Sequence, residues 1–359
     1  MHSLVNFFKK GTSVQPNNNT TEQIATAVEG LKVALLGSMN NIGQPLSLLL
    51  KRTNLFDEIA LHDEMDTKDQ AEQLLSVDLP GKVTSHRGKE GIKSAIKDAN
   101  IVLVVGGKVY HPDISKFSRD EVYNNCKYVY ECSKNCVAHS PFAITCVSTG
   151  PLTTTFTVAS EVFKAAHRNF HYKVIGVNNF LSIKADLALG SSLRTKNMQV
   201  IPVIGGCTPK TSVPLISCVT AKSTLSTQSS IFLTQKYQRP SVLDIASSEN
   251  RDVSSMTQAF GVCQFASSLA KTISSKQPGF IENAFVMTKD TYDIPCFGLP
   301  VMFGKFGIKS MYDLPSKMHF YEAGLLKIIK PTVAKEVKEG QEIYKQIVEG
   351  IEEKKTFIE

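Results

Sequence analysis

The stretch LKVALLGSMNNIGQPLSLLL, residues 31–50, decides the fold of this chain. It opens with an apolar run that ends in Gly37, as expected of a strand buried on both faces of a parallel sheet. The residues after that glycine have the apolar spacing of a helix. A strand, a glycine turn and a helix in this order predict the start of a doubly wound α/β unit.

Strands and helices continue to alternate after this start. Apolar runs predict strands within residues 56–64, 97–107 and 142–150, and helical spacing predicts helices over 67–77 and 118–136. Strands that alternate with helices imply a parallel sheet with right-handed crossovers.

The second half of the chain has a different pattern. Residues 200–206 and 282–308 predict antiparallel strands with turns, whereas residues 226–272 are mostly helical. Residues 315–354 predict a long amphipathic helix that is interrupted near Pro331, because proline removes a backbone donor.

The composition is that of a globular protein with room for two domains or one large two-layer unit. The chain has 359 residues, of which 42% are hydrophobic and 20% charged, and no apolar run approaches the roughly 20 residues needed to span a bilayer. Its net charge of +7 comes from scattered residues, which favours a solvated surface over a nucleic-acid groove. The eight cysteines lack zinc spacing, so we predict buried, reduced thiols, a reducing compartment and no metal site.

Residues 1–30 precede the first clear strand and form an N-terminal extension. The first part of this extension contains two lysines, a short apolar stretch and no acid. A mitochondrial transit peptide fits these features, although such peptides are normally rich in arginine and this segment has none. A disordered polar arm fits them equally well, and both alternatives stay open.

The turn after the first strand has the context that a dinucleotide-binding fingerprint requires. Gly37 would make the tight turn, and Gly43 would allow close packing of helix on strand. Asn40 replaces the middle glycine; asparagine tolerates a left-handed backbone, but its side chain can crowd the phosphates. Asp63, at the end of the second strand, is spaced as a ribose-hydroxyl acceptor, which favours NAD over NADP. The alternative is that these residues only make a turn and a sheet edge.

Five stretches carry a resemblance to a known family: KVALLGSMNNIGQPLSLLLKR (32–52), SRDEV (118–122), ASEVFK (159–164), IPVIGGCTPKTSVPLIS (201–217) and GLPVMFGKFGI (298–308). Together they resemble NAD-dependent malate dehydrogenase, in its mitochondrial-type branch, in register from Lys32 to Val348. The resemblance implies a Rossmann dinucleotide-binding domain over residues 31–175 and an α+β substrate domain over 176–359. It also implies NAD as cofactor, a homodimer or a heteromer with a related subunit, and a mitochondrial location, with the cytoplasm as the alternative. By the same resemblance, the cofactor would contact Gly37, Ile42, Gly43, Asp63, Gly106 and Gly107.

The resemblance breaks at the residues that carry the family's chemistry. Cys207 stands where the family has its proton-transferring histidine, and Leu181 where it has the aspartate that orients that histidine. Lys184 takes the place of a substrate-binding arginine, whereas Arg119 matches the second arginine of the loop that closes over substrate. Tyr110 is nearest to the first arginine of that loop, and Gly150 replaces an asparagine near the nicotinamide.

These replacements predict a divergent member without the catalytic pair. A positioned general acid–base contributes about 10²–10⁴ in rate, and a thiol lacks the second nitrogen that a carboxylate can orient. Lysine also lacks the planar fork with which arginine grips a carboxylate, so Lys184 is a poorer substrate anchor, although Arg119 and Lys184 could still attract an anion. Because an aspartate buried without its histidine would be an unpaired charge, the joint loss of both is cheaper to fold than either alone.

Three hypotheses follow. The first is a catalytically inactive protein with a structural or regulatory role and residual NAD binding. The second is an active oxidoreductase of malate, oxaloacetate or a related 2-hydroxy acid that has recruited His111 or Cys207. The third is a scaffold in a larger assembly. His167 and His171 precede a strand and are expected to lie away from the nicotinamide.

Overall fold

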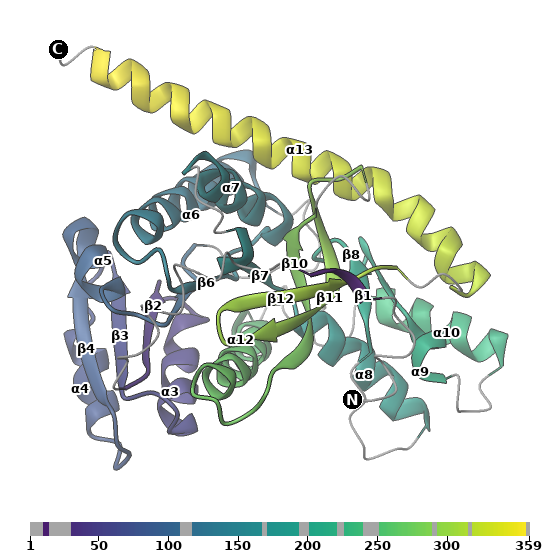
Figure 1. Cartoon of the computed structure of the whole chain (residues 1–359), viewed down its shortest axis with the longest axis horizontal. Helices are drawn as coiled ribbons and strands as arrows, with labels where there is room; N and C mark the ends of the chain where they lie inside the picture. The colour runs from purple at the N-terminus through teal and green to yellow at the C-terminus, as the bar shows by residue number, and fades with distance from the viewer. Residues whose placement is uncertain are drawn as a thin grey trace.

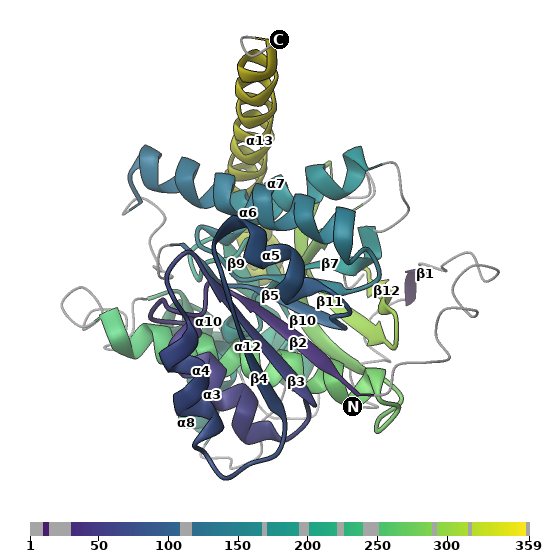
Figure 2. The ribbon, with the colours of Figure 1, turned by 90° about the vertical axis from the view of Figure 1, so that its left-hand side faces the viewer.

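The structure, a computed structural model, is built around one mixed β-sheet with helices on both faces (Figure 1, Figure 2). It describes residues 10–13, 30–107, 117–166, 171–193, 201–220, 226–239, 251–288, 293–314 and 318–356.

The N-terminal half contributes a parallel sheet whose strand order is β4-β3-β2-β5-β6-β7. Its strands are β2 (Lys32–Leu36), β3 (Glu58–Asp63), β4 (Lys82–Arg87), β5 (Ile101–Val104), β6 (Ile144–Val147) and β7 (Val174–Val177). The order reverses between β2 and β5, which is the topological switch point of a doubly wound fold. The predicted fold class is therefore confirmed, and ligands of such folds bind outside the carboxyl ends of the strands.

Helices connect these strands and cover both faces of the sheet (Figure 2). They are α3 (Gly43–Thr53), α4 (Lys68–Leu75), α5 (Gly88–Ile96), α6 (Arg119–His139) and α7 (Leu152–Ala165). A capping box begins α6, because the Ser118 hydroxyl accepts from the Glu121 N–H and the Glu121 carboxylate accepts from the Ser118 N–H. The pair β4 and α5 lies in a stretch where we predicted no element.

The C-terminal half extends the same sheet with antiparallel strands, as predicted for residues 200–206 and 282–308. Strand β10 (Phe280–Met287) pairs with β7 and with β11 (Cys296–Gly304), and β11 pairs with β12 (Gly307–Tyr312) and β8 (Val203–Gly205). The remaining elements are β9 (Ser212–Pro214), the short 3₁₀ turn η2 (His171–Lys173), and the helices α8 (Phe180–Leu193), α9 (Ile216–Thr220), α10 (Thr227–Gln238) and α12 (Arg251–Ile273).

Part of the predicted N-terminal extension belongs to the sheet. Strand β1 (Lys10–Ser13) pairs antiparallel with β12, so that Lys10 faces Tyr312 and Ser13 faces Ser310. The outermost strand of this half is therefore β1, and β12 is paired on both of its edges.

The last helix, α13 (Phe320–Thr356), crosses the top of the molecule in Figure 1 and is continuous through Pro331. The predicted interruption is wrong. Proline at 331 removes the bond to the carbonyl of Lys327, but both residues are exposed, so water can hydrate that carbonyl and the helix continues.

Two sequence expectations concern composition. All eight cysteines are free and buried, which confirms the predicted buried thiols. No helix in the described part of the chain is long and apolar enough to cross a membrane.

Glycine at 340 sets the distance between α13 and α7. A Cβ at Gly340 would lie 2.7 Å from the Thr154 carbonyl oxygen and 2.8 Å from the Thr157 Cβ, whereas a Cβ at Gly324 would meet nothing within 4 Å. We expect Gly340→Ala to lower the free energy of unfolding by roughly 1–2 kcal/mol, because overpacking outweighs the gain in helix propensity. The matched control Gly324→Ala should raise it by about 0.5–1 kcal/mol. Urea denaturation measures both, and equal effects of the two variants would contradict the packing described.

Candidate active site and dinucleotide cleft

The turn between β2 and α3 brings distant backbone segments together. Gly37 has a φ of +92°, and a Cβ there would lie 2.3 Å from the Gly106 Cα. A Cβ on Gly43 would lie 2.2 Å from the Gly37 carbonyl oxygen. Both positions therefore require glycine for the turn and for the approach of α3 to the sheet.

Asn40 fills the start of α3 with its own side chain. Its Oδ1 accepts hydrogen bonds from the backbone N–H groups of Ile42, at 2.9 Å, and Gly43, at 2.6 Å. Its Nδ2 donates to the Val105 carbonyl at 2.6 Å. The first N–H groups of a helix are the donors that hold a phosphate in a fingerprint of this kind, and here two of them are already satisfied.

The backbone expected at Asn40 is not found. Asn40 is not among the described non-glycine residues with positive φ. The turn keeps its shape because the amide bridges α3 and the end of β5 instead.

Tyr128 of α6 occupies the crevice beside this turn. A Cβ on Gly106 would lie 2.3 Å from the Tyr128 ring, so the ring covers the backbone after β5. Burial raises the pKa of the Tyr128 phenol, and Cys132, Asp63 and Glu64 raise it further. The ring therefore lies against the carboxyl end of β5, beside the switch point.

The other predicted cofactor contacts also bind parts of the chain. Asp63 accepts from the Met39 N–H at 3.0 Å, within the glycine turn. Gly107 has a φ of +96°, and a Cβ there would lie 2.5 Å from Asn125 Oδ1. Asn125 in turn donates to the Gly150 carbonyl at 2.6 Å. In this arrangement the cleft does not fit a dinucleotide. Asn40 already accepts from two N–H groups that would hold the phosphates, and the Tyr128 ring covers the backbone at Gly106.

Cys207 and Leu181 are both buried and belong to two hydrophobic clusters. Cys207 follows β8, is 1% exposed and belongs to the large hydrophobic cluster. Leu181 is fully buried in a smaller cluster with Val203 and Tyr237. Burial raises the pKa of the Cys207 thiol well above its usual range, which opposes formation of a thiolate.

A buried carboxylate lies near Cys207. Glu336 of α13 is 6% exposed, and neither of its oxygens has a hydrogen-bond partner in the described residues. Thr153 at the start of α7 is close enough to lower the pKa of Glu336 without reaching hydrogen-bond geometry. Burial dominates and raises that pKa to about 7, and the Glu336 charge raises the pKa of Cys207.

The predicted anion-binding residues lie on two different helices. Arg119 is the first residue of α6 and is exposed, whereas Lys184 is half-buried in α8. Tyr110, His111 and His167 lie outside the described residues. His171 begins the turn η2 before β7, at the amino end of that strand and thus at the edge opposite the cleft.

Sequence patterns did not identify Tyr128, Glu336 or Tyr237 as site residues. Tyr237 of α10 is 1% exposed, and its hydroxyl lies 2.7 Å from the Ser212 Oγ. The available signal at Glu336 was an acid within the apolar spacing of α13. Only the packing of α13 on α7 reveals that this acid is buried.

The fold and the glycine turn resemble those of nicotinamide-dependent dehydrogenases. Residues 31–176 match the family model of the lactate/malate dehydrogenase NAD-binding domain. The chain is 28% identical over 324 residues to mitochondrial malate dehydrogenase of Felis catus, covering 90% of this chain and 94% of the relative. It is 29% identical over 318 residues to mitochondrial malate dehydrogenase of Sus scrofa, covering 88% and 92%.

Solved structures agree with this fold. Plasmodium falciparum malate dehydrogenase in complex with NADH superposes with a TM-score of 0.68 at 16% identity, covering 88% of this chain and 99% of that one. Over most of its length the chain is therefore similar to the lactate/malate dehydrogenases.

The buried Glu336 predicts a pH-dependent stability. Its pKa is raised from 4.5 to about 7 by folding, so the folded state binds more protons than the unfolded state between these values. Burial of the charged Glu336 lowers the free energy of unfolding. This cost is absent below pH 4.5, where the carboxyl group is protonated in both states, and complete above pH 7, where it is charged in both states. Relative to wild type, Glu336→Gln should therefore gain roughly 2–3 kcal/mol in unfolding free energy between pH 5 and pH 8.

Chemical denaturation at the two pH values measures this difference. Glu349→Gln, which changes an exposed carboxylate on the same helix, is the matched control and should show no such gain. A gain of equal size for both variants would mean that Glu336 is not buried as described.

Proposed function

We propose that this protein is a non-catalytic member of the lactate/malate dehydrogenase family with a structural or regulatory role. The observation that carries the proposal is the environment of Cys207. Where the resemblance places an imidazole paired with a carboxylate, the chain has a buried thiol and an apolar Leu181, and nearby lies the Glu336 carboxylate, which has no hydrogen-bond partner within the described residues. A buried acid at this place repels a dicarboxylate substrate rather than attracting it.

The same proposal includes loss of the cofactor. Asn40 satisfies two N–H groups that a pyrophosphate would need, and Tyr128 covers the backbone at Gly106. A dinucleotide would have to displace both side chains, and Asn40 would then lose three hydrogen bonds. This geometry favours exclusion of NAD over the residual binding that the sequence leaves open.

The alternative is an active oxidoreductase with altered catalytic residues. Recruitment of Cys207 is opposed by its burial, since a thiol with a raised pKa is a poor nucleophile and a poor base at neutral pH. Recruitment of His111 concerns a residue outside the described part of the chain. We therefore place the non-catalytic function first.

The location we propose is the mitochondrion, with the cytoplasm as the alternative. The supporting observation is that the relatives reported above are mitochondrial proteins by name.

Oxidation of NADH with oxaloacetate, together with NADH binding by calorimetry, tests the proposed function. The wild-type protein should show no turnover and no NADH binding. Asn40→Gly/Tyr128→Ala should bind NADH without turnover, because it frees the helix donors and uncovers Gly106 while the catalytic pair stays absent. A Leu181→Asp/Cys207→His change in the same background tests whether that pair restores chemistry.

The matched control is Asn54→Gly/Tyr123→Ala, which changes an asparagine with positive φ at the end of α3 and an exposed tyrosine of α6. It should leave NADH binding undetectable. Turnover by the wild-type protein would overturn the non-catalytic proposal. Tight NADH binding by the wild type without turnover would contradict the proposed loss of cofactor binding but not the proposed loss of catalysis.

We propose further that the protein forms a homodimer through α3, α8 and α12. These helices are neighbours along the lower side of Figure 1, and each carries large exposed apolar side chains. Leu48 is 50% exposed, Leu187 65%, Met256 61% and Phe260 50%. A soluble protein rarely leaves so much apolar surface without a partner.

Multi-angle light scattering after gel filtration tests the dimer. The wild type should elute as a dimer, and Phe260→Glu should weaken the dimer at least about tenfold, because it places a charge within an apolar interface. Met65→Glu, an equally exposed site outside these helices, should have no effect. A monomeric wild type would exclude this interface between identical chains, and recovery of activity on mixing with a related active subunit would favour a heteromer.

A further inference from the structure

A cavity of 790 Å³ lies at the edge of the sheet opposite the dinucleotide cleft. Its wall includes Lys32 at the start of β2, Glu58 at the start of β3, Lys82 at the start of β4 and Ile144 at the start of β6. These strands are parallel, so their amino ends meet at one edge and their carboxyl ends, with the glycine turn, meet at the other. The cavity is therefore separate from the cleft.

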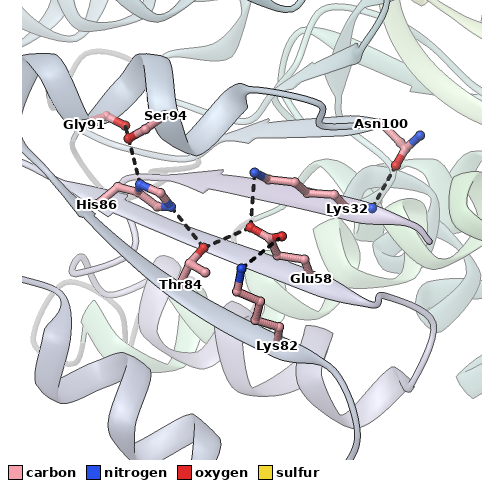
Figure 3. Close-up of polar contacts among 8 residues, drawn as sticks. All are labelled: Lys32, Glu58, Lys82, Thr84, His86, Gly91, Ser94 and Asn100. Atoms are coloured by element: carbon pink, nitrogen blue, oxygen red, sulfur yellow. Dashed lines mark hydrogen bonds and ion pairs between the residues drawn. The ribbon is translucent and has the colours of Figure 1, made fainter. Parts of the chain in front are cut away.

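Positive charge dominates the cavity wall. Five lysines and three carboxylates line it, which leaves a formal balance of two positive charges. Figure 3 shows that Lys32 and Lys82 share the single carboxylate of Glu58, at 3.1 and 3.8 Å. Asn100 accepts from the Lys32 N–H at 2.8 Å and turns its amide nitrogen away from that strand (Figure 3).

Lys173 is the unusual member of this set. It precedes β7 directly, is only 4% exposed and has no carboxylate within ion-pair distance among the described residues. Its Nζ donates one hydrogen bond, at 2.8 Å, to the Phe142 carbonyl, and lies 5.7 Å from the Tyr172 ring centroid and 6.0 Å from that of Phe306. Burial lowers the pKa of Lys173 to about 8, so the side chain still carries its charge at neutral pH.

A buried ammonium without a counter-charge is costly to fold. Lys173 has three N–H donors, and the bond to the Phe142 carbonyl uses one of them. An anion in the cavity would supply both the missing charge and the missing acceptors. Because Lys173 lines the cavity, such an anion can reach it.

Aromatic and apolar groups complete the wall. Phe142 is 48% exposed beside Lys173, and Phe306 and Leu55 line the same cavity. A cavity of this volume accommodates a metabolite rather than a lone inorganic ion. Its lining suits a planar apolar body with an anionic group at one end.

We infer that this cavity binds a small organic anion that joins a planar apolar body to a phosphate or carboxylate, with Lys173 as its buried counter-ion. The site is independent of the dinucleotide cleft and of the catalytic residues discussed above.

Two helix ends oppose this binding and must be weighed. The C-terminal ends of α6, at His139, and of α12, at Ile273, also face the cavity. Each helix end is equivalent to about half a negative elementary charge. Together these two ends offset about one of the two formal positive charges. Helices α3 and α5 also end just before the lining residues Leu55 and Asp98, so the positive charge that an anion meets is the local charge of the buried Lys173.

Isothermal titration calorimetry with phenyl phosphate and benzoate tests the inference. We expect saturable binding of at least one of them, and the tighter of the two identifies the anionic group. Phenol, which lacks the charge, should bind at least about tenfold more weakly. Inorganic phosphate, which lacks the planar body, should also bind at least about tenfold more weakly.

Lys173→Met is the decisive variant and should weaken binding at least about tenfold. It should fold, since methionine fills a similar volume and removes an unpaired buried charge. The matched control is Lys164→Met, whose charge is met by Glu161 and which does not line the cavity, and it should change the affinity less than about threefold. Equal affinity of Lys173→Met and wild type would overturn the proposal, as would the absence of saturable binding of both aryl anions up to about 10 mM.

Discussion

The close approach of the turn after β2 to the end of β5 is the constraint on which the cleft depends. A side chain at Gly37 would strike the backbone of Gly106, so the turn can only be built with glycine at this point. The same approach brings Asn40 within reach of the Val105 carbonyl and of the first N–H groups of α3. One amide thus satisfies donors that otherwise need a phosphate or water, and a cap of this kind is worth about 1 kcal/mol to a helix. The turn of a nucleotide-binding fold therefore persists without requiring a nucleotide.

The residues around Cys207 affect the free energy of folding in two opposite directions. Leu181 and Cys207 bury without hydrogen-bond demands, so their presence makes the core cheaper to fold than an ionic pair would. Glu336 has the opposite effect and destabilises the folded state, because a carboxylate with no hydrogen-bond partner in the described structure is costly to bury at neutral pH. The proposed loss of catalysis accounts for the first two residues but not for Glu336. The environment of Cys207 therefore contains one buried acid, Glu336, that the absence of the catalytic pair does not account for.

Much of the fold could be predicted from local patterns, because buried parallel strands such as residues 101–104 are continuous apolar runs. The strand β4 was missed since KVTSHR at the sheet edge is largely polar and lacks that run. The continuity of α13 was missed because the effect of Pro331 depends on whether its helix face meets solvent, which only packing decides. Tyr128 and Glu336 were missed for a related reason. Each side chain meets residues of a distant element, and no periodicity in the sequence reports which elements become neighbours.

The two edges of the parallel sheet differ in what they can bind. At the carboxyl edge, helix N-termini supply donors for anions without any charged side chain, and in this chain Asn40 and Tyr128 occupy that position. At the amino edge the helices end, so their carbonyls disfavour anions and only side-chain charge can reverse the balance. Lysine begins β2 and β4 and directly precedes β7, which places three ammonium groups along this edge. Glu58 pairs with the first two, whereas the buried Lys173 has no acid within ion-pair distance in the described parts of the chain. Anion recognition in this chain therefore has its physical basis at the amino edge, in charge supplied by side chains rather than by the fold.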